Sequence, residues 1–306
     1  MRIIVLGAGA IGSLYGAKLA ARNEVTLVGR ADHVRAIQEK GLRVEGIESE
    51  TVRLNAATDL GNIHPNTLIL LTTKVPATSR ALEPIAPMIR EDTTIVALQN
   101  GLNSDEIARE ALGGRGIVLR GITQFGAIFE RPGAIRYMVK GYTLLQKHER
   151  SASIAEVFNA AGLDCRISAE INREVWRKLI FNCVVNPITA LLGTTVGEIV
   201  DPGLNPLKQR VIDECVAVAA AEGVSLNVTL KEVDKAYVGS PNIVSMRQDL
   251  LRGRPTEIEH LNGTIVSLGA AHGILCPANK VLASLVQGIG TRSAALALKK
   301  QEDVPA

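Results

Sequence analysis

Three polar side chains recur at intervals of four residues within an apolar stretch of the chain: Lys178, Asn182 and Asn186. This spacing places them on one face of a helix whose other residues have the character of a protein core. Burying an unpaired amide costs about 1–3 kcal/mol, so these groups need hydrogen-bond partners. They either bind neighbouring helices or face a polar ligand. Pro187 slightly favours the ligand, because it frees the carbonyl of Cys183 and kinks the helix.

A glycine-rich turn at the start of the chain is typical of a dinucleotide site. It follows an apolar, strand-like run, Ile3 to Leu6, and opens a helical segment. In such a turn the first Gly permits a tight bend, the second lets the backbone approach a pyrophosphate, and the third lets helix and strand pack closely. The alternative is a turn with a purely structural role. The residues predicted to bind the nucleotide here are Gly7, Ala8, Gly9, Ala10, Ile11 and Gly12.

The residue after the second predicted strand, Arg30, bears on the choice of nucleotide. A site for NAD usually has a carboxylate here for the ribose 2′-hydroxyl, whereas a guanidinium can pair with a 2′-phosphate. We therefore expect NADP rather than NAD. The alternative is that Arg30 is a solvated loop cation and that Asp32 is the N-cap of the next helix.

Two more polar residues follow apolar strands, at the edge of the sheet where ligands bind in this kind of fold. Lys74 follows Leu68–Leu71, and Asn100 follows Ile95–Leu98. We expect both to lie along the crevice for the cofactor. Alternatively, Lys74 is a surface lysine and Asn100 belongs to an ordinary Asn-Gly turn.

The elements that must position these residues change in kind near residue 170. Short apolar runs alternate with amphipathic segments up to residue 169, which predicts a parallel sheet with helices on both faces. We expect residues 42–54 to form a hairpin, and the runs after Gly116 to add antiparallel strands to the sheet. Beyond residue 170, apolar residues recur at helical spacing. We therefore predict an α/β protein, with a Rossmann-type doubly wound domain over residues 1–169 and an all-helical domain over residues 170–306.

The composition excludes several classes of protein. The chain has 306 residues, of which 46% are hydrophobic and 21% charged, so it can bury a sizeable core. A net charge of +3 without a basic cluster, and 3% aromatic residues, argue against nucleic-acid binding. The cysteines and histidines lack the spacing of metal ligands, and no run is long and apolar enough to span a membrane. We therefore expect a cytoplasmic protein without a metal site.

Several of these motifs occur together in the ketopantoate reductase (2-dehydropantoate 2-reductase) family, which the chain resembles over nearly its whole length. The residues that carry the resemblance are Gly7-x-Gly9-x-x-Gly12, the Lys74 loop, Gln99-Asn100-Gly101, Trp176-Arg177-Lys178-Leu179, Asn182-x-x-x-Asn186-Pro187, Asn242-x-x-Ser245-Met246-x-x-Asp249 and Thr256-Glu257-Ile258-x-x-x-Asn262-Gly263. The resemblance implies NADPH-dependent reduction of 2-dehydropantoate to pantoate, on the route to pantothenate and coenzyme A.

The resemblance also implies roles for individual residues. Lys178 is the expected proton donor while hydride adds to the 2-oxo carbon, in a cleft between the domains. A lysine serves best as an acid where desolvation lowers its pKa towards the working pH. The expected substrate contacts are Asn100, Asn182, Asn186, Asn242 and Ser245. The expected cofactor contacts beyond the glycine turn are Arg30, Lys74, Asn100, Ala127 and Glu257.

Two of the downstream residues also have structural explanations. Glu257 lies in the first turn of a predicted helix, where the helix dipole alone favours a carboxylate. Thr256 and Glu259 have the spacing of a capping box, which predicts a structural role for Glu259.

One position departs from the family pattern. Family members commonly have an Asn that contacts the substrate before a Gly-Glu pair, and here that position is Val196. Loss of one hydrogen bond costs about 0.5–1.5 kcal/mol, so the substrate is less well defined than the reaction. A reductase of another 2-oxo acid and a non-catalytic NADP-sensing regulator stay as alternatives, and the oligomeric state, a homodimer included, stays open. A phosphorylated or larger substrate would need further cations, for which Arg247, Arg252 and Arg254 are available. The alternative is that these arginines form a solvated face.

Overall fold

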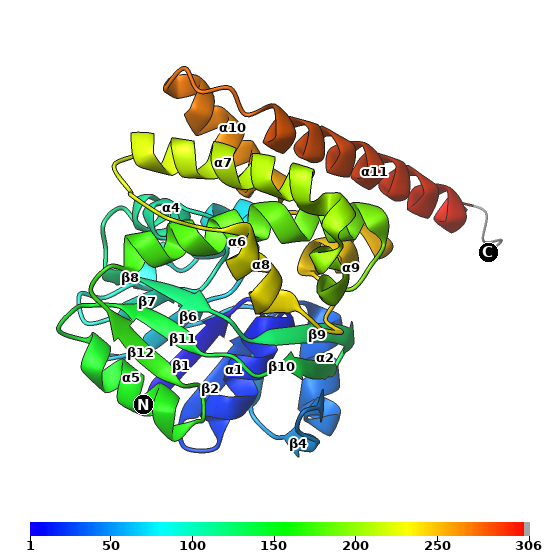
Figure 1. Ribbon diagram of the computed structural model, residues 1–306. Coiled ribbons are helices and arrows are strands. Elements are labelled where there is room, and N and C mark those ends of the chain that lie inside the picture. Colours follow the sequence, from blue (N-terminus) through cyan, green and yellow to red (C-terminus); the bar gives the residue numbers. More distant parts are fainter. Residues whose placement is uncertain (303–306) are drawn as a thin grey trace. The chain divides into compact units, whose positions relative to one another are not determined.

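The structure, a computed structural model, describes the backbone of residues 1–302 and the side chains of residues 1–292. The chain divides into two compact units, the first being Met1–Ile171 and the second beginning at Asn172. All the described strands belong to the first unit, and the described elements of the second unit are helices (Figure 1). The predicted fold class, an α/β sheet domain followed by a helical one, is confirmed.

An eight-stranded sheet forms the centre of the first unit, with the strand order β12-β11-β8-β7-β6-β1-β2-β5. Neighbouring strands run parallel except for β8 and β11, which are antiparallel. The strands of this sheet are β1 (Arg2–Leu6), β2 (Glu24–Val28), β5 (Asn55–Ala57), β6 (Leu68–Leu71), β7 (Thr94–Ala97), β8 (Ile117–Thr123), β11 (Thr143–Gln146) and β12 (Cys165–Ser168).

The strand order of this sheet reverses beside β1. The chain runs from β1 to β2 and β5 on one side, and then returns to β6, which pairs with β1 on the other side. In open α/β sheets, ligands bind outside the carboxyl ends of the strands at such a reversal. The turn after β1 and the loop after β6 are neighbours there, since Thr72 Oγ1 donates a hydrogen bond to Gly7 O at 2.8 Å.

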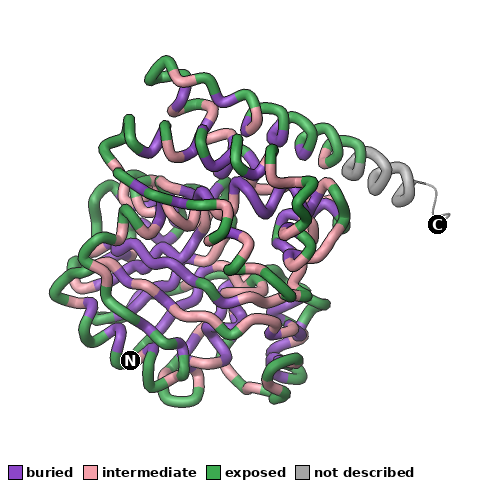
Figure 2. The backbone as a smooth tube through the Cα atoms, in the orientation of Figure 1, coloured by how far each residue is buried: buried purple, intermediate pink, exposed green. Residues whose placement is uncertain are grey.

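Successive residues of the central strands enter two separate cores. Leu68 and Leu70 pack into one core, while Ile69 and Leu71 pack into the other. All four side chains are buried, as are the central strands in general (Figure 2). Burial on both faces explains why these strands read as unbroken apolar runs in the sequence. The helical segments of this unit are α1 (Ala10–Ala20), α2 (Ala31–Lys40), η1 (Val75–Ala77), α3 (Thr78–Leu82), η2 (Ala86–Met88), α4 (Ser104–Ala111) and α5 (Ser151–Ala160).

A second, four-stranded sheet packs on α1, in the order β4-β3-β10-β9. Its strands are β3 (Leu42–Gly46), β4 (Glu50–Val52), β9 (Gly126–Arg131) and β10 (Ala134–Val139), and β3 and β4 form the predicted hairpin. The expectation that the later strands join the main sheet is right for β11 but wrong for β9 and β10, which pair with each other and with β3. Packing explains the difference, because β9 and β10 lie against α1. Tyr15 of α1 meets Phe125 edge-on, and Tyr137 of β10 belongs to the same buried core, so this sheet covers a face of α1.

A buried histidine joins this second sheet to two helices. The Nδ1 atom of His33, on α2, accepts the N–H of Gly133 at 2.9 Å, and its Nε2 atom lies 3.1 Å from Ser13 Oγ on α1. Because Nδ1 is an acceptor, the neutral ring carries its proton on Nε2 and donates it to Ser13. Burial lowers the pKa of His33, against the opposing effect of Asp32.

The second unit is built from helices around a core that contains a buried lysine. Lys208 is fully buried, and its Nζ atom donates to Ile199 O and to Asp234 Oδ1, each at 2.7 Å. No described helix combines the length and the apolar character that crossing a bilayer requires. The helical segments are α6 (Ile171–Leu192), η3 (Val196–Val200), η4 (Pro202–Leu204), α7 (Asn205–Ala221), α8 (Leu230–Tyr237), α9 (Ser245–Leu251), η5 (Ile258–His260), α10 (Asn262–Ala271) and α11 (Pro277–Glu302).

Candidate functional site

The turn after β1 is held by hydrogen bonds and by close backbone contacts. The N–H groups of Gly7 and Ala8 both donate to Val28 O, at 3.0 and 2.9 Å, which fastens the turn to the end of β2. Gly7 has φ +112°, and a Cβ there would lie 2.5 Å from the backbone nitrogen of Thr73. A Cβ at Gly12 would lie 2.2 Å from Gly7 O. Both positions therefore require glycine for steric reasons, before any ligand is considered.

Gly9 differs from these two glycines, because it faces open space. A Cβ at Gly9 would meet no atom within 4 Å, and its φ of −81° is allowed to any residue. Gly9 is the N-cap of α1, which has no side-chain cap and no acidic residue in its first turn. The first-turn N–H groups of Ala10, Ile11 and Gly12 have no helical partner, since the helical bonding begins with Ser13 N–H to Gly9 O. Free space ahead of amides at the positive end of a helix fits a pyrophosphate.

Arg30 lies at the end of β2, next to the glycine turn. It is exposed and is the N-cap of α2, where its side chain makes no capping hydrogen bond. The expectation that Asp32 is the N-cap is therefore wrong. Asp32 lies in the first turn of α2 and accepts the N–H of His33 at 2.8 Å. Gly29 allows the backbone after β2 to approach the glycine turn closely, because a Cβ at Gly29 would lie 2.7 Å from the Cβ atom of Ala8.

The other residues predicted in the first unit lie on two loops and on the second sheet. Lys74 is exposed at the N-cap of η1, in the loop after β6, and Asn100 is half-buried in the loop after β7. Since β6 and β7 are parallel neighbours, these loops leave the same edge of the sheet as the glycine turn. Ala127 lies on β9, so it belongs to the second sheet, and it packs against the same core as Ala8 and Ile11.

In the second unit, α6 carries the predicted polar stripe. Lys178 and Asn182 are half-buried, and Asn186 is 7% exposed. Within the part of the chain that the structure describes, no hydrogen bond joins the side-chain amide of Asn182 or Asn186 to another residue. The alternative that these amides bind neighbouring helices is therefore not what the structure has. Two amides on one face of a mainly apolar helix are available to a ligand.

Pro187 interrupts the hydrogen bonding of α6 beside the stripe. A proline has no N–H, so the carbonyl of Cys183 loses its helical donor. Asn262 replaces it, because its Nδ2 atom donates to Cys183 O at 3.0 Å and also to Asn279 Oδ1 at 2.9 Å. Asn279 is bound in turn by Glu214, whose Oε2 atom accepts its Nδ2–H at 2.8 Å. A buried polar network thus supports α6 where the helix is interrupted.

Asn242 and Ser245 precede and begin α9, and backbone pairing holds this segment against η3. Asn242 is half-buried, and its carbonyl accepts the N–H of Val196 at 2.9 Å. Ser245 is exposed at the first position of α9. Gly197 N–H donates to Ser240 O at 2.9 Å, and a Cβ at Gly197 would lie 2.8 Å from the same oxygen. Val196, where the family commonly has Asn, is therefore beside the Asn242 segment, and its own side chain is buried.

Glu257 is half-buried, and it lies before the short helix η5 rather than in the first turn of a longer helix. The predicted capping box is absent here, since no side chain caps η5, and the Oε1 atom of Glu259 instead accepts a hydrogen bond from Gln287. The helix α10 begins only at Asn262. Arg247, considered above as a cation for a larger substrate, donates to Thr194 O at 2.9 Å and so has a structural role.

Sequence reasoning assigned no role to the groups that support these loops. Arg120 and Gln99 are buried beneath Asn100, and Asn262 is buried beside Pro187. A charge inside the apolar run Val118 to Ile122 was a signal for the first of these. A proline in an apolar helix signals that some other donor must replace its missing N–H, but the sequence does not identify that donor.

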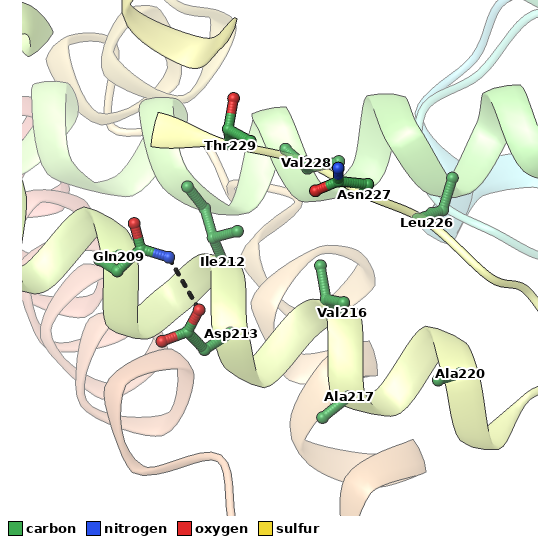
Figure 3. Close-up of a pocket in the computed structure, with 10 residues that line it drawn as sticks. All are labelled: Gln209, Ile212, Asp213, Val216, Ala217, Ala220, Leu226, Asn227, Val228 and Thr229. Carbon is green, nitrogen blue, oxygen red and sulfur yellow. Dashed lines mark hydrogen bonds between the residues drawn. The ribbon is translucent and has the colours of Figure 1, made fainter. Parts of the chain in front are cut away.

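The second unit also has a surface cavity that holds none of the predicted residues. It has a volume of about 450 Å³ and is lined by one side of α7 and the segment before α8 (Figure 3). Its polar side chains include Gln209 and Asp213, which are hydrogen-bonded to each other at 2.8 Å. No described group of three or more His, Cys, Asp or Glu side chains is placed to hold a metal ion.

Two family models match the chain. The model for ketopantoate reductase PanE/ApbA matches residues 3–150, and the model for its C-terminal part matches residues 170–290. The 2-dehydropantoate 2-reductase of Pyrococcus horikoshii is 36% identical over 94% of this chain and 97% of its own length. The enzyme of the same name from Halobacterium salinarum is 33% identical over 94% of this chain and 98% of its own length.

Solved structures give the same result for the fold. A PanE/ApbA family ketopantoate reductase from Ralstonia eutropha superimposes with a TM-score of 0.87 at 33% identity, over 96% of this chain and 99% of its own. A D-mandelate dehydrogenase in complex with NADH and anilino(oxo)acetate also superimposes with a TM-score of 0.87, at 26% identity, over 96% of this chain and 99% of its own. The first of these structures is described as a ketopantoate reductase, and the second as a dehydrogenase that acts on D-mandelate.

Proposed function

Since the chain belongs to the ketopantoate reductase (PanE/ApbA) family, we propose that it is an oxidoreductase that reduces 2-dehydropantoate to pantoate with NADPH. The observation that carries the proposal is the pair of side-chain amides on α6 that have no partner among the described residues. Packing alone gives no reason to keep amides on an apolar helix, whereas a substrate with carboxylate, carbonyl and hydroxyl groups does. The reaction takes place in the cytoplasm in this proposal.

The nucleotide is assigned to the first unit. The open space over Gly9 and the free amides of Ala10 to Gly12 support binding of the pyrophosphate there. Arg30, exposed beside the same turn, supports NADPH over NADH, because its guanidinium can form charge-assisted hydrogen bonds with a 2′-phosphate. When bound, the reduced nicotinamide supplies a hydride for the 2-oxo carbon. Lys74, Ala127 and Glu257 contact the nucleotide in this proposal, and Asn100 contacts both nucleotide and substrate.

The substrate contacts are assigned to Lys178, Asn182, Asn186, Asn242 and Ser245. Lys178 donates a proton to the oxygen of the 2-oxo group as negative charge develops on it, so that the product is an alcohol. The neutral amides of Asn182 and Asn186 orient the polar groups of the substrate without competing for that proton. Their position on a helix supported by the Asn262 network favours a fixed geometry.

Substitutions of Lys178 test the acid role. We expect Lys178→Ala to lower kcat by about 10²–10⁴-fold, with NADPH affinity nearly unchanged. Lys178→Arg retains a cation that does not lose its proton, so it separates proton transfer from charge stabilisation. A near-normal kcat in Lys178→Ala contradicts the acid role, and a near-normal kcat in Lys178→Arg alone restricts Lys178 to stabilising charge.

The turnover assay itself uses ketopantoate and a small panel of alkyl and aryl 2-oxo acids, with NADPH oxidation as the readout. A reductase of another 2-oxo acid is the second candidate, favoured by the buried Val196 beside Asn242 and by the likeness to the D-mandelate dehydrogenase. Higher kcat/KM on an aryl substrate supports that candidate. NADPH binding without turnover on any member of the panel refutes both reductase candidates and leaves the alternative of a non-catalytic NADP-sensing regulator.

Arg30→Ala tests the preference for NADPH. We expect this change to weaken NADPH binding far more than NADH binding, because only NADPH has the 2′-phosphate. Fluorescence titration of both nucleotides gives the two dissociation constants. Equal losses for the two nucleotides contradict the assignment of Arg30.

A further inference from the structure

A buried arginine lies beneath the loop that carries Asn100. Arg120, on β8, is 4% exposed and pairs in the sheet with Ala97, three residues before Asn100. Its Nη2 atom donates to Gln99 O at 3.1 Å and to Gly101 O at 2.6 Å. These are the carbonyls on either side of Asn100. One guanidinium nitrogen therefore holds the carbonyls of the residues before and after Asn100, whose side chain we assign to both nucleotide and substrate.

The other end of the guanidinium holds the far side of the same loop. Its Nη1 atom donates to Ser104 Oγ and lies 3.6 Å from Asp105 Oδ1, and these two residues begin α4. Gly101, between the two contacts, has φ +88°, so the backbone reverses there in a conformation that favours glycine. Arg120 thus joins the end of β7 to the start of α4 and leaves Asn100 little freedom.

The contact continues to the loop of Lys74 through Gln99. The side chain of Gln99 is 6% exposed, and its Nε2 atom donates to Thr73 Oγ1 at 3.0 Å and to Thr78 Oγ1 at 2.7 Å. Thr73 directly precedes Lys74 and is also the residue whose backbone limits the size of Gly7. Arg120 bonds only the backbone carbonyl of Gln99, so the Gln99 side chain, and not Arg120, makes the link to the loop of Lys74.

A purely structural purpose explains this arrangement poorly. Burying a charged guanidinium carries a large desolvation cost, and an apolar side chain of similar volume often stabilises a core equally well. Arg120 shows that cost, because burial lowers its pKa to about 10, and its Nε atom is enclosed without a partner. The group still stays protonated at neutral pH and keeps its donors directed at the loop.

We propose that Arg120 is a positioning residue, which acts on the reaction by fixing the backbone on both sides of Asn100. The inference rests on the proposed function, because it presumes that Asn100 contacts the bound reactants. It assigns to Arg120 no contact with nucleotide or substrate. Its effect must therefore pass through Asn100, which makes it measurable.

A double-mutant cycle tests this dependence. We expect Arg120→Met to lower kcat/KM about tenfold or more in the wild-type background, but by less than about twofold when Asn100 is already Ala. NADPH affinity, measured by fluorescence titration, follows the same pattern. If the two changes multiply, Arg120 does not act through Asn100, and the proposal is overturned. It is also overturned if Asn100→Ala lowers activity while Arg120→Met leaves it unchanged.

Two further variants separate positioning from folding. Arg120→Lys keeps the charge but lacks the planar group that reaches both carbonyls, so it is expected to reproduce the defect, and the cycle is run with Lys if the Met variant does not fold. Asn159→Ala is the matched control, because Asn159 also bonds two backbone groups, Cys165 N and O, but at the β12 edge of the sheet. We expect Asn159→Ala to lower the free energy of unfolding and leave kcat/KM unchanged. A fall in kcat/KM equal to that of Arg120→Met would reduce Arg120 to a stability role.

A wild-type protein that neither binds NADPH nor turns over any 2-oxo acid refutes the proposed function instead.

Discussion

Replacing Gly9 with Ala should separate nucleotide binding from stability. The new Cβ meets no atom within 4 Å, and φ is already −81°. The free energy of unfolding should therefore fall only by the difference between Gly and Ala at an N-cap, less than about 1 kcal/mol. The methyl group would instead occupy open space beside the turn, where we propose that the pyrophosphate binds to the amides of Ala10, Ile11 and Gly12. A hydrogen bond to a charged group contributes about 1.5–3 kcal/mol, so losing one of them weakens NADPH binding about 10–150-fold.

Two other glycines serve as controls for this experiment. Gly12→Ala puts a Cβ 2.2 Å from Gly7 O, so it should lower the free energy of unfolding by about 1–3 kcal/mol in addition to any effect on binding. Gly61→Ala also meets open space, in the exposed loop after β5, and should change neither property. Urea denaturation measures stability, and fluorescence titration measures the NADPH dissociation constant. Unchanged NADPH affinity in Gly9→Ala would show that no pyrophosphate approaches this position, and the reasoning about the turn would fail.

Two further predictions concern buried polar groups. Burial lowers the pKa of His33, so below about pH 6.5 the unfolded chain binds a proton that the folded protein does not. The stability that the neutral His33 contributes is therefore complete above about pH 6.5 and is lost as the pH falls. His33→Gln should flatten the pH dependence of the urea midpoint in that range, and an unchanged dependence would contradict this. Asn262→Ala should cost about 1–3 kcal/mol by leaving Cys183 O without a donor, and less in a Pro187→Ala background, where the N–H of residue 187 can again bond that carbonyl. Additive losses in the two urea-denaturation series would show that Asn262 does not replace the missing N–H.

Elements with strong local signals could be predicted from the sequence. The alternation of apolar runs with helical segments indicated the parallel sheet, because strands buried on both faces cannot show a polar side. Gly7 and Gly12 stood at positions where backbone geometry alone requires glycine, so their spacing carried structural information. The stripe on α6 was visible since its period matched the helix.

Features that depend on contacts distant in the sequence could not be predicted. The strands β9 and β10 have the same local pattern as strands of the main sheet, and only their packing on α1 with β3 removes them from it. The prediction of a capping box at Thr256 was wrong because the spacing of the two residues is necessary but not sufficient. Glu259 accepts a hydrogen bond from Gln287 instead. The donor that reaches Cys183 lies 79 residues away, on α10, so no local rule could have identified it.

The position of Arg30 has a consequence for how nucleotide preference can evolve. Arg30 is the N-cap of α2 and makes no capping bond, in a place where helices favour Asp. Exchanging Arg for Asp would give the helix a cap and, at the same time, supply the carboxylate that suits an unphosphorylated ribose. In the proposed binding mode, a change of preference from NADPH towards NADH therefore needs only one exposed substitution, Arg30→Asp, and Gly29 and Ala8 beside it keep the conformation of the glycine turn.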